Sequence, residues 1–276
     1  MKPLTRPLTR RALLGRRLLK RFLYSQLALR QGLMIALGRE EPLAAFTVEA
    51  DPPSVYWVFR VRADAVGRLR SVLQLPAAFE STPIRCLTSD VPEHIIVLNV
   101  YRVSGLAKGM RAEWSLFVGD AEGIPRYMVF DARSSLLSMD AVDVITRKST
   151  VEHVRDGQTI STRVGDGDSA FTSTITIPSG DGAPLVTTAA DWSTANDYIY
   201  WGNGICDRTY YDAGMAAARV RDVAAIHVTI DDRTSWADLI EPTPLHVLVF
   251  EDAINLVISP WENLRRLQPD GATRHS

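Results

Sequence analysis

The sequence predicts a β-rich α+β fold, in which antiparallel strands form most of the body and a few helices flank them. Short runs of β-branched and aromatic residues recur between turn signals after residue 50. These runs do not alternate with long helical segments, as βαβ units would, and the chain has no internal repeat. Because 46% of its 276 residues are hydrophobic, the chain can bury a full core. Closure of the strands into a barrel would remove exposed sheet edges and enclose a pocket.

The first 39 residues form a basic segment that differs from the rest of the chain. They hold ten Lys and Arg residues and no acid, whereas the remainder holds 21 basic and 32 acidic residues, a balance of −11. Apolar residues recur in this segment near helical spacing: Leu13, Leu14, Leu18, Leu19, Phe22 and Leu23. We therefore divide the chain into a basic amphipathic helical arm, residues 1–39, and one domain, residues 40–276.

Two partners suit such an arm. A basic amphipathic helix can lie on an anionic membrane surface as a peripheral contact. Alternatively, it can pack on the body of the protein or on a neighbouring subunit. No run of about 18 apolar residues is present, so the sequence predicts no membrane span.

The body opens with a strand and a short helix. Residues 54–61 (SVYWVFRV) are β-branched and aromatic and predict a strand. Asp64 can cap a helix that runs to Leu73, and Pro76 stops it. Further strands are predicted at residues 93–103, 113–118 and 126–131.

A hairpin is predicted where Asp156-Gly157 separates residues 144–155 from residues 158–164. Residues 169–177 alternate, with Phe171, Ile175 and Ile177 on one face. Aromatic residues then crowd one region and are expected in the core or a subunit contact: Trp192, Tyr198, Tyr200, Trp201, Tyr210 and Tyr211. The remaining predictions are a helix at residues 211–223, strands at 225–230, 245–250 and 254–258, and a helical turn at 260–267.

Several function classes are disfavoured. An acidic body lacks the positive face that nucleic acid requires. The two cysteines, Cys86 and Cys206, form neither a disulfide framework nor a metal cluster, which fits a reducing, cytoplasmic location. The histidines His94, His153, His227 and His246 share no metal-ligand spacing. Motifs of nucleotide-binding folds, serine hydrolases and zinc peptidases are absent, so we expect no metal and no cofactor.

Lys148 is the candidate nucleophile. Only four of the 31 basic residues are lysines, and Lys148 is one of two within the body. Lysine can lose its proton and attack a carbonyl carbon, whereas arginine cannot. Its pKa would have to fall from about 10.4 to about 6–7, which costs roughly 5 kcal/mol and calls for burial or a neighbouring cation. The alternative is a solvated strand lysine.

The order of segments resembles the acetoacetate decarboxylase superfamily across roughly residues 45–180. A short helix ends in Leu75-Pro76, and the family's GPYNE-like segment corresponds to residues 109–113 (GMRAE). A lysine follows some 35 residues later, then the Asp156-Gly157 hairpin and a strand that ends at Ile177-Pro178. The family's GFPKK-like segment corresponds to residues 145–149 (ITRKS), which keep one lysine of the pair and lack the Gly, Phe and Pro.

The resemblance implies a cone-shaped antiparallel β-barrel, a homo-oligomer, and a lysine that forms a Schiff base with a keto acid or related carbonyl compound. Lys148 would be the nucleophile and Glu113 the acid–base partner, while Arg111 or Arg147 would hold a substrate carboxylate. Glu113 could instead be an outward carboxylate paired with an arginine. The other function that the sequence allows is a noncatalytic barrel that binds a small apolar or carboxylate ligand, or a protein partner.

Overall fold

The computed structural model describes residues 10–38, 44–86, 91–105, 108–119, 125–135, 149–178, 185–186, 197–202, 205–213, 219–223 and 227–258. Its α-helices are α1 (Arg10–Ala36) and α2 (Leu69–Val72), with short 3-10 turns at Val66–Arg68, Gly167–Ser169 and Ala237–Leu239. Its strands are β1 (Ala44–Val48), β2 (Val55–Arg60), β3 (Glu80–Ser81), β4 (Ile95–Gly105), β5 (Gly109–Gly119), β6 (Arg126–Ser134), β7 (Val151–Asp156), β8 (Thr159–Val164), β9 (Phe171–Thr176), β10 (Leu185–Val186), β11 (Asp197–Gly202), β12 (Ile205–Ala213), β13 (Val220–Asp222), β14 (Val228–Asp232), β15 (His246–Phe250) and β16 (Ile254–Ile258).

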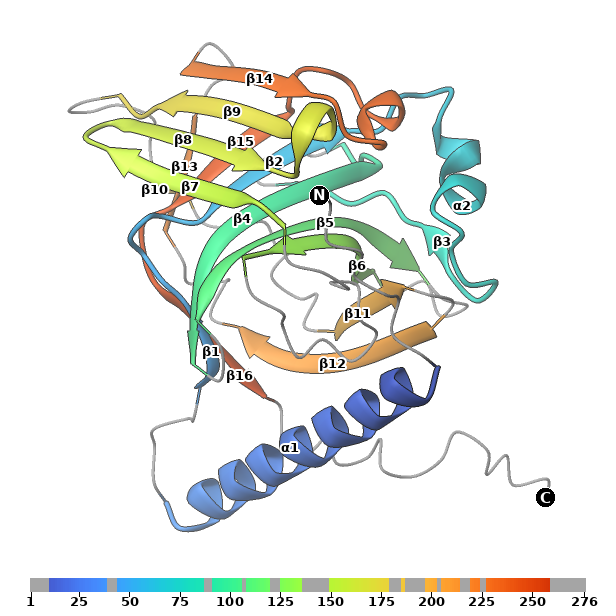
Figure 1. The fold of residues 1–276 in the computed structure, drawn as a ribbon, viewed down its shortest axis with the longest axis vertical. Helices are drawn as coiled ribbons and strands as arrows, with labels where there is room; N and C mark the ends of the chain where they lie inside the picture. Colours follow the sequence, from blue (N-terminus) through green and yellow to red (C-terminus); the bar gives the residue numbers. More distant parts are fainter. Residues whose placement is uncertain are drawn as a thin grey trace, which may run out of the picture.

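The strands form two sheets (Figure 1). The larger has the order β10-β13-β15-β2-β4-β1-β16-β12-β11-β6-β5-β3, and the smaller has the order β14-β9-β8-β7. The strand pairings within the described segments are antiparallel, except that β11 runs parallel to β6. β4 also pairs directly with β5, so successive pairings lead from β4 through β5, β6, β11, β12, β16 and β1 and return to β4.

The first core lies between the two sheets. Strand alternation points Val55, Trp57 and Phe59 of β2 towards the smaller sheet, where Phe171 of β9 is fully buried against them. The rings of Trp57 and Phe171 meet edge to face with centroids 5.2 Å apart, and the Trp57 Nε1–H donates to Ser173 Oγ at 3.1 Å. Buried aromatic contacts and a satisfied indole therefore join the sheets.

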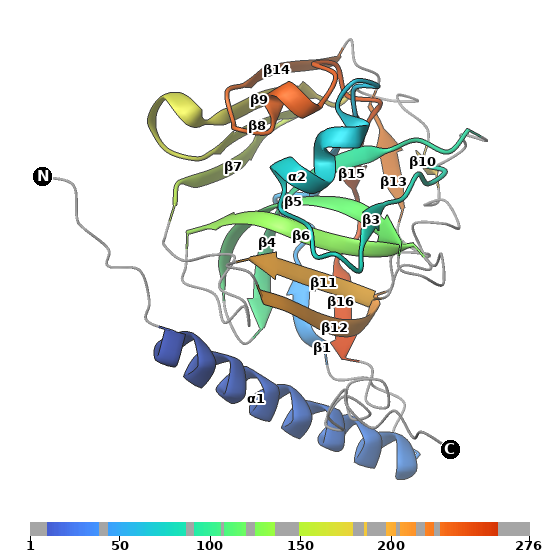
Figure 2. The ribbon, with the colours of Figure 1, turned by 90° about the vertical axis from the view of Figure 1, so that its right-hand side faces the viewer.

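The second core lies on the opposite face of the larger sheet. Its buried apolar side chains come from strands β1, β2, β4, β5, β6, β13, β15 and β16 and from the segment that contains Ile84 and Cys86. Helix α1 forms a separate layer beyond these strands (Figure 2), and its Leu27 packs against the second core. Leucine, alanine and arginine favour this helix, which ends at Ala36. Gly38, two residues later, has φ +68°, a conformation that glycine adopts without strain. None of the described helices combines the length and the apolar character needed to cross a bilayer.

The sequence located most of the body strands and the hairpin. The predictions at residues 54–61, 93–103, 126–131, 169–177, 245–250 and 254–258 correspond to β2, β4, β6, β9, β15 and β16. Asp156 and Gly157 separate β7 from β8, with Gly157 at φ +58° as a tight hairpin requires. Phe171, Ile175 and Ile177 are buried together, as their alternation predicts.

One element prediction was wrong. The helix expected at residues 211–223 is not formed at either end, because Tyr211–Ala213 belong to β12 and Val220–Asp222 form β13. Each of these segments pairs with a neighbouring strand, so sheet hydrogen bonds set the conformation of both ends of the predicted helix. Strand β14 begins three residues later than the strand predicted at residue 225, and residues 260–267 lie outside the described segments.

Candidate functional site

Strand β5 places charged side chains on the face of the second core. Successive side chains of a strand point to opposite faces, and Ala112, Trp114 and Leu116 face the first core. Arg111, Glu113 and Ser115 therefore face the other way, alongside Phe117 of the second core. Arg111 is 7% exposed, Glu113 3% and Ser115 0%, so β5 carries a buried polar row through an apolar region.

Arg111 and Glu113 form a buried ion pair. The Arg111 Nε–H donates to Glu113 Oε1 at 2.5 Å, a short charge-assisted hydrogen bond. On β4, Asn99 lies opposite Glu113 in the sheet register, and its Nδ2 lies 3.5 Å from Glu113 Oε2. The carboxylate is thus held on one oxygen by a cation and approached on the other by an amide. Such support is what allows a charge to persist away from water.

Tyr56 extends this polar group to β2. It pairs with Asn99 across the sheet and is 7% exposed. Burial raises the pKa of the Tyr56 phenol well above its usual range, and the negative charge of Glu113 raises it further, while a hydrogen bond with Asn99 lowers it in part. Tyr56 is therefore a neutral phenol at physiological pH. We name Tyr56, Asn99, Arg111, Glu113 and Ser115 the polar cluster.

Two buried oxygen atoms of the polar cluster lack a hydrogen-bond partner within the described part of the chain. They are Asn99 Oδ1 and Ser115 Oγ. Leaving a buried polar atom unpaired costs about 1–3 kcal/mol. Among the described residues, the second core therefore contains polar atoms whose hydrogen bonding the surrounding apolar side chains do not satisfy.

The structure brings together two of the four predicted site residues. Arg111 and Glu113 lie side by side, and Arg111 contacts Glu113 itself. Lys148 and Arg147 lie outside the described residues. Ser149, the residue bonded to Lys148, donates its backbone N–H to the carbonyl of Ser134 at 2.9 Å. Ser134 pairs with Arg111 across β5 and β6, so the chain that follows Lys148 begins beside the Arg111 end of the polar cluster.

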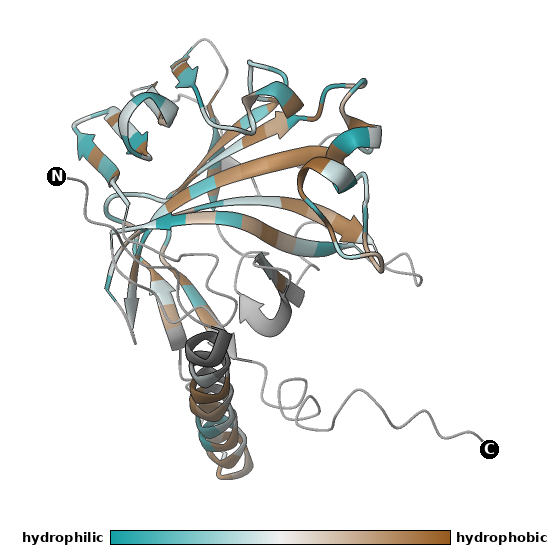
Figure 3. Ribbon diagram, turned by 45° about the vertical axis from the view of Figure 1, so that its right-hand side comes forward, coloured by the Kyte–Doolittle hydropathy of each residue, from teal (hydrophilic) through white to brown (hydrophobic). Residues whose placement is uncertain are grey.

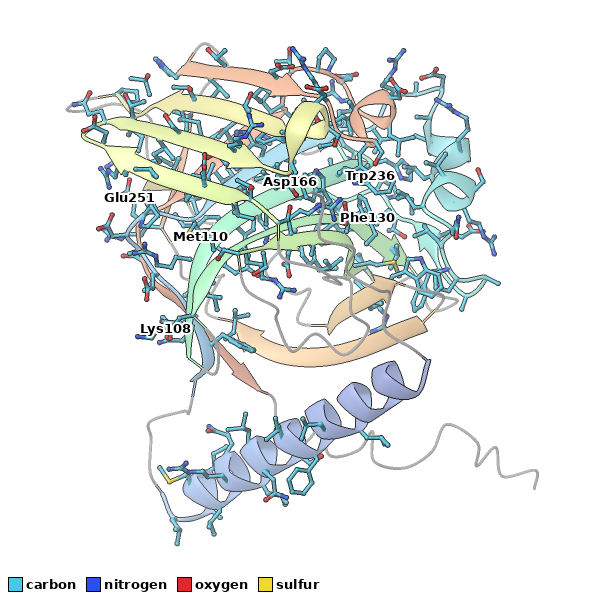
Figure 4. All side chains as sticks on the ribbon, in the orientation of Figure 1. Lys108, Met110, Phe130, Asp166, Trp236 and Glu251 are labelled. Atoms are coloured by element: carbon cyan, nitrogen blue, oxygen red, sulfur yellow. The ribbon has the colours of Figure 1, made fainter. Side chains whose placement is uncertain are left out.

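Lys108, the other lysine of the body, directly precedes β5 and lies three residues before Arg111 in the sequence. Figure 4 shows it at the start of that strand. Its residue is exposed, as expected for a loop lysine. Lys108 therefore provides a matched comparison for Lys148 in chemical experiments.

Sequence reasoning did not select Asn99 and Tyr56. A signal for Asn99 was present, because it is the one polar residue in the run Ile95–Val100 (IIVLNV). An amide in the middle of a buried strand is expected to have a buried partner. Tyr56 gave no comparable signal, because an aromatic residue in a strand is ordinary packing material.

The described segments contain no group of three or more His, Cys, Asp or Glu side chains arranged to hold a metal ion. The buried histidine His153 is instead engaged by protein atoms, with Nδ1 2.8 Å from Thr162 Oγ1 and Nε2 2.8 Å from the Pro53 carbonyl.

Comparison with known proteins gives little beyond this geometry. No protein-family model matches the chain, and no curated protein matches it. Among solved structures, an acetoacetate decarboxylase-like enzyme from Sphingomonas wittichii RW1 is similar to the chain with a TM-score of 0.44 and 8% identity. The match covers 76% of this chain and 88% of that one. These values correspond to a distant similarity of fold.

Proposed function

We propose that the protein is a Schiff-base lyase that acts on a keto acid or a related carbonyl compound. Lys148 is the nucleophile, Glu113 moves the proton, and Arg111 and Arg147 attract the substrate carboxylate. The observation that carries the proposal is the buried Arg111–Glu113 pair beside the start of the segment that follows Lys148. A carboxylate and a guanidinium buried together in an apolar wall are costly to maintain for stability alone.

The proposed chemistry uses groups of this chain only. The Lys148 amine attacks the substrate carbonyl carbon, and loss of water gives an iminium. In a 3-keto acid, the bond between the carboxylate and the carbon next to the iminium carbon then breaks. Its electron pair moves towards the iminium nitrogen, and carbon dioxide leaves. The resulting enamine takes a proton on carbon, and Glu113 is placed to move that proton. Water then releases the product and returns the free amine.

The surrounding wall suits this sequence of steps. An unprotonated lysine requires a site of low polarity, and the second core supplies buried Val97, Phe117 and Val129 on the same face as Glu113. We propose that the cycle of strands from β4 through β5, β6, β11, β12, β16 and β1 is the closed wall of a cone-shaped barrel. The cyclic order of the pairings supports this, because a closed barrel requires it.

We extend the proposal to the organisation of the chain. Residues 40–276 form one domain, residues 1–39 form an arm, and the protein works as a cytoplasmic homo-oligomer. The separate layer of α1 supports the division (Figure 2).

Borohydride trapping tests the lyase. The full chain is mixed with single keto acids such as acetoacetate, pyruvate and 2-oxoglutarate, reduced, digested and mapped by mass. We expect a stable adduct on the peptide that contains Lys148. The Lys148→Arg variant should lose it, and the matched Lys108→Arg variant should keep it. No adduct across a broad panel, or an adduct that survives Lys148→Arg, would refute the proposal.

A noncatalytic ligand-binding barrel is the second candidate. The contacts of Glu113 favour it, because both carboxylate oxygens already have partners in the protein. Oε1 accepts a hydrogen bond from Arg111, and Oε2 faces the Asn99 amide. A carboxylate held in this way stabilises a site without moving a proton. This alternative predicts that a keto acid raises the melting temperature of both the wild type and Lys148→Arg, with no adduct on either.

A further inference from the structure

We infer that helix α1 is a docking surface for an anionic lipid membrane, which it meets with the face turned away from the body. This inference is independent of the proposed lyase. It rests on three features of the arm: an exposed apolar stripe, a second face already occupied by the body, and the sign of the charge around the stripe.

The stripe consists of large apolar side chains that are exposed to solvent. Leu18 is 59% exposed, Phe22 59%, Leu29 53% and Leu33 60%. At about 100° per residue, these four positions fall within an arc of about 60° along the helix. Figure 3 shows apolar residues along the length of this helix. One exposed leucine is ordinary, but several large apolar side chains exposed along one side of a helix, with Ser25 and Gln26 between the two pairs, mark an interaction site.

The opposite side of α1 is the side that contacts the body. Leu27 packs against the second core, and Gln31 is buried at 5% exposure. Both project about 150–190° from the middle of the stripe. The stripe therefore does not face the body. If α1 turned about its axis to bury the stripe against the same strands, Leu27 would lose its own contact with them. An external partner is needed to cover the stripe.

Charge selects the partner. Helix α1 contains seven basic residues and no acid, and residues 1–39 contain ten. The rest of the chain carries a balance of −11, so the arm is attracted to a negative surface. Two copies meeting stripe to stripe would bring two cationic helices together. An anionic bilayer surface offers both an apolar interior for the leucines and phosphate for the arginines.

Vesicle flotation with the full chain tests this inference. Vesicles of phosphatidylcholine with about 30% phosphatidylserine are compared with pure phosphatidylcholine, because only the anionic surface should attract basic residues strongly. We expect binding to the mixed vesicles that weakens when salt rises from about 0.05 M to about 0.5 M. Replacing Leu29 and Leu33 by serine should weaken partitioning at least about tenfold, since each leucine loses burial in the bilayer.

The control variant carries Val91→Ser and Val154→Ser, two valines of the body with 62% and 61% exposure. It should bind as the wild type does, and circular dichroism should show all variants folded. No binding to anionic vesicles at low salt, or equal binding by Leu29→Ser/Leu33→Ser, overturns the inference. A third outcome also overturns the inference: the wild type does not bind vesicles, light scattering shows that it is an oligomer, and Leu29→Ser/Leu33→Ser is a monomer. The stripe would then bind a second copy of the chain.

Discussion

Arg111 and Glu113 stand two positions apart on one strand and turn to the same side, where their side chains meet at 2.5 Å. Both are nearly inaccessible to water. The sequence selected Glu113 as a candidate functional carboxylate, and the structure shows that it is buried and paired with Arg111. The pair also makes the energetics of the site measurable without knowledge of any substrate.

The pair should be far more sensitive to single replacement than to joint replacement. Removal of one partner leaves a buried charge unpaired, which costs about 3–5 kcal/mol, whereas apolar replacement of both is often neutral. We expect Glu113→Leu and Arg111→Met each to lower the free energy of unfolding by that amount. The double variant should recover most of it. Urea unfolding of the four proteins provides the double-mutant cycle, and additive losses would show that the two charges are not coupled.

Stability should fall in mild acid because of His153. Burial lowers the pKa of His153, and the hydrogen bond to the Pro53 carbonyl offsets only part of that effect. The Nε2–H donates to this carbonyl, so Nδ1 accepts from the Thr162 hydroxyl and the ring is neutral. The unfolded chain therefore binds more protons than the folded chain below about pH 6.5, and stability present above that pH is lost as the pH falls.

The test for His153 is the slope of stability against pH. His153→Gln should unfold more easily than the wild type at pH 8 but lose less stability between pH 7 and pH 5. His94 also has a pKa lowered by burial, so His94→Gln serves as the comparison and should retain the His153 contribution. If the dependence of stability on pH is unchanged in His153→Gln, groups other than His153 cause the loss of stability in acid.

Phe171 should be among the most costly positions to truncate. It is fully buried between the sheets and meets Trp57 and Phe59 edge to face, with centroids 5.2 and 6.5 Å away. Phe171→Ala should lower the free energy of unfolding by about 3–5 kcal/mol, because it removes the ring and leaves a cavity. Val154→Ala, at an exposed position on the same sheet, should change it by no more than about 0.5 kcal/mol. A small loss at Phe171 would mean that the sheets do not depend on this contact.

Deletion of residues 1–39 should leave a folded body. Helix α1 contributes Leu27 to the edge of the second core, while the buried members of that core come from the body. We expect a cooperative thermal transition within a few degrees of the wild type and a single symmetric peak in gel filtration. Aggregation of the truncated chain would show instead that the arm covers core.

The strands were predictable where β-branched and aromatic residues form an unbroken run. Residues 55–60 and 95–103 consist largely of such residues, and this composition is strong enough to define their type. The Asp156-Gly157 turn was equally clear, because few sequences suit that geometry as well. Strand β1 was not predicted, because AAFTV is short and its alanines have no preference for strands.

The helix predicted at residues 211–223 failed for a different reason. Local propensity favours a helix where alanines are frequent, but Tyr211 and Val220 pair with strands distant in the sequence. Pairing partners of this kind cannot be read from a single segment. The polar cluster shows the same limit, because Asn99 and Glu113 come together only through the register of β4 and β5. Glu113 itself was predicted from its segment, and it is buried in the structure.

The outer strands of the smaller sheet are β7 and β14, and their sequences bear on self-association. Edge strands can recruit matching strands from other molecules, and charged residues on them oppose this. β14 ends in Asp231 and Asp232, while β7 carries Glu152, Arg155 and Asp156. A further strand added along either margin would have to bury some of these charges against its own backbone and side chains. The two margins of the smaller sheet therefore oppose growth of the sheet from one molecule to the next.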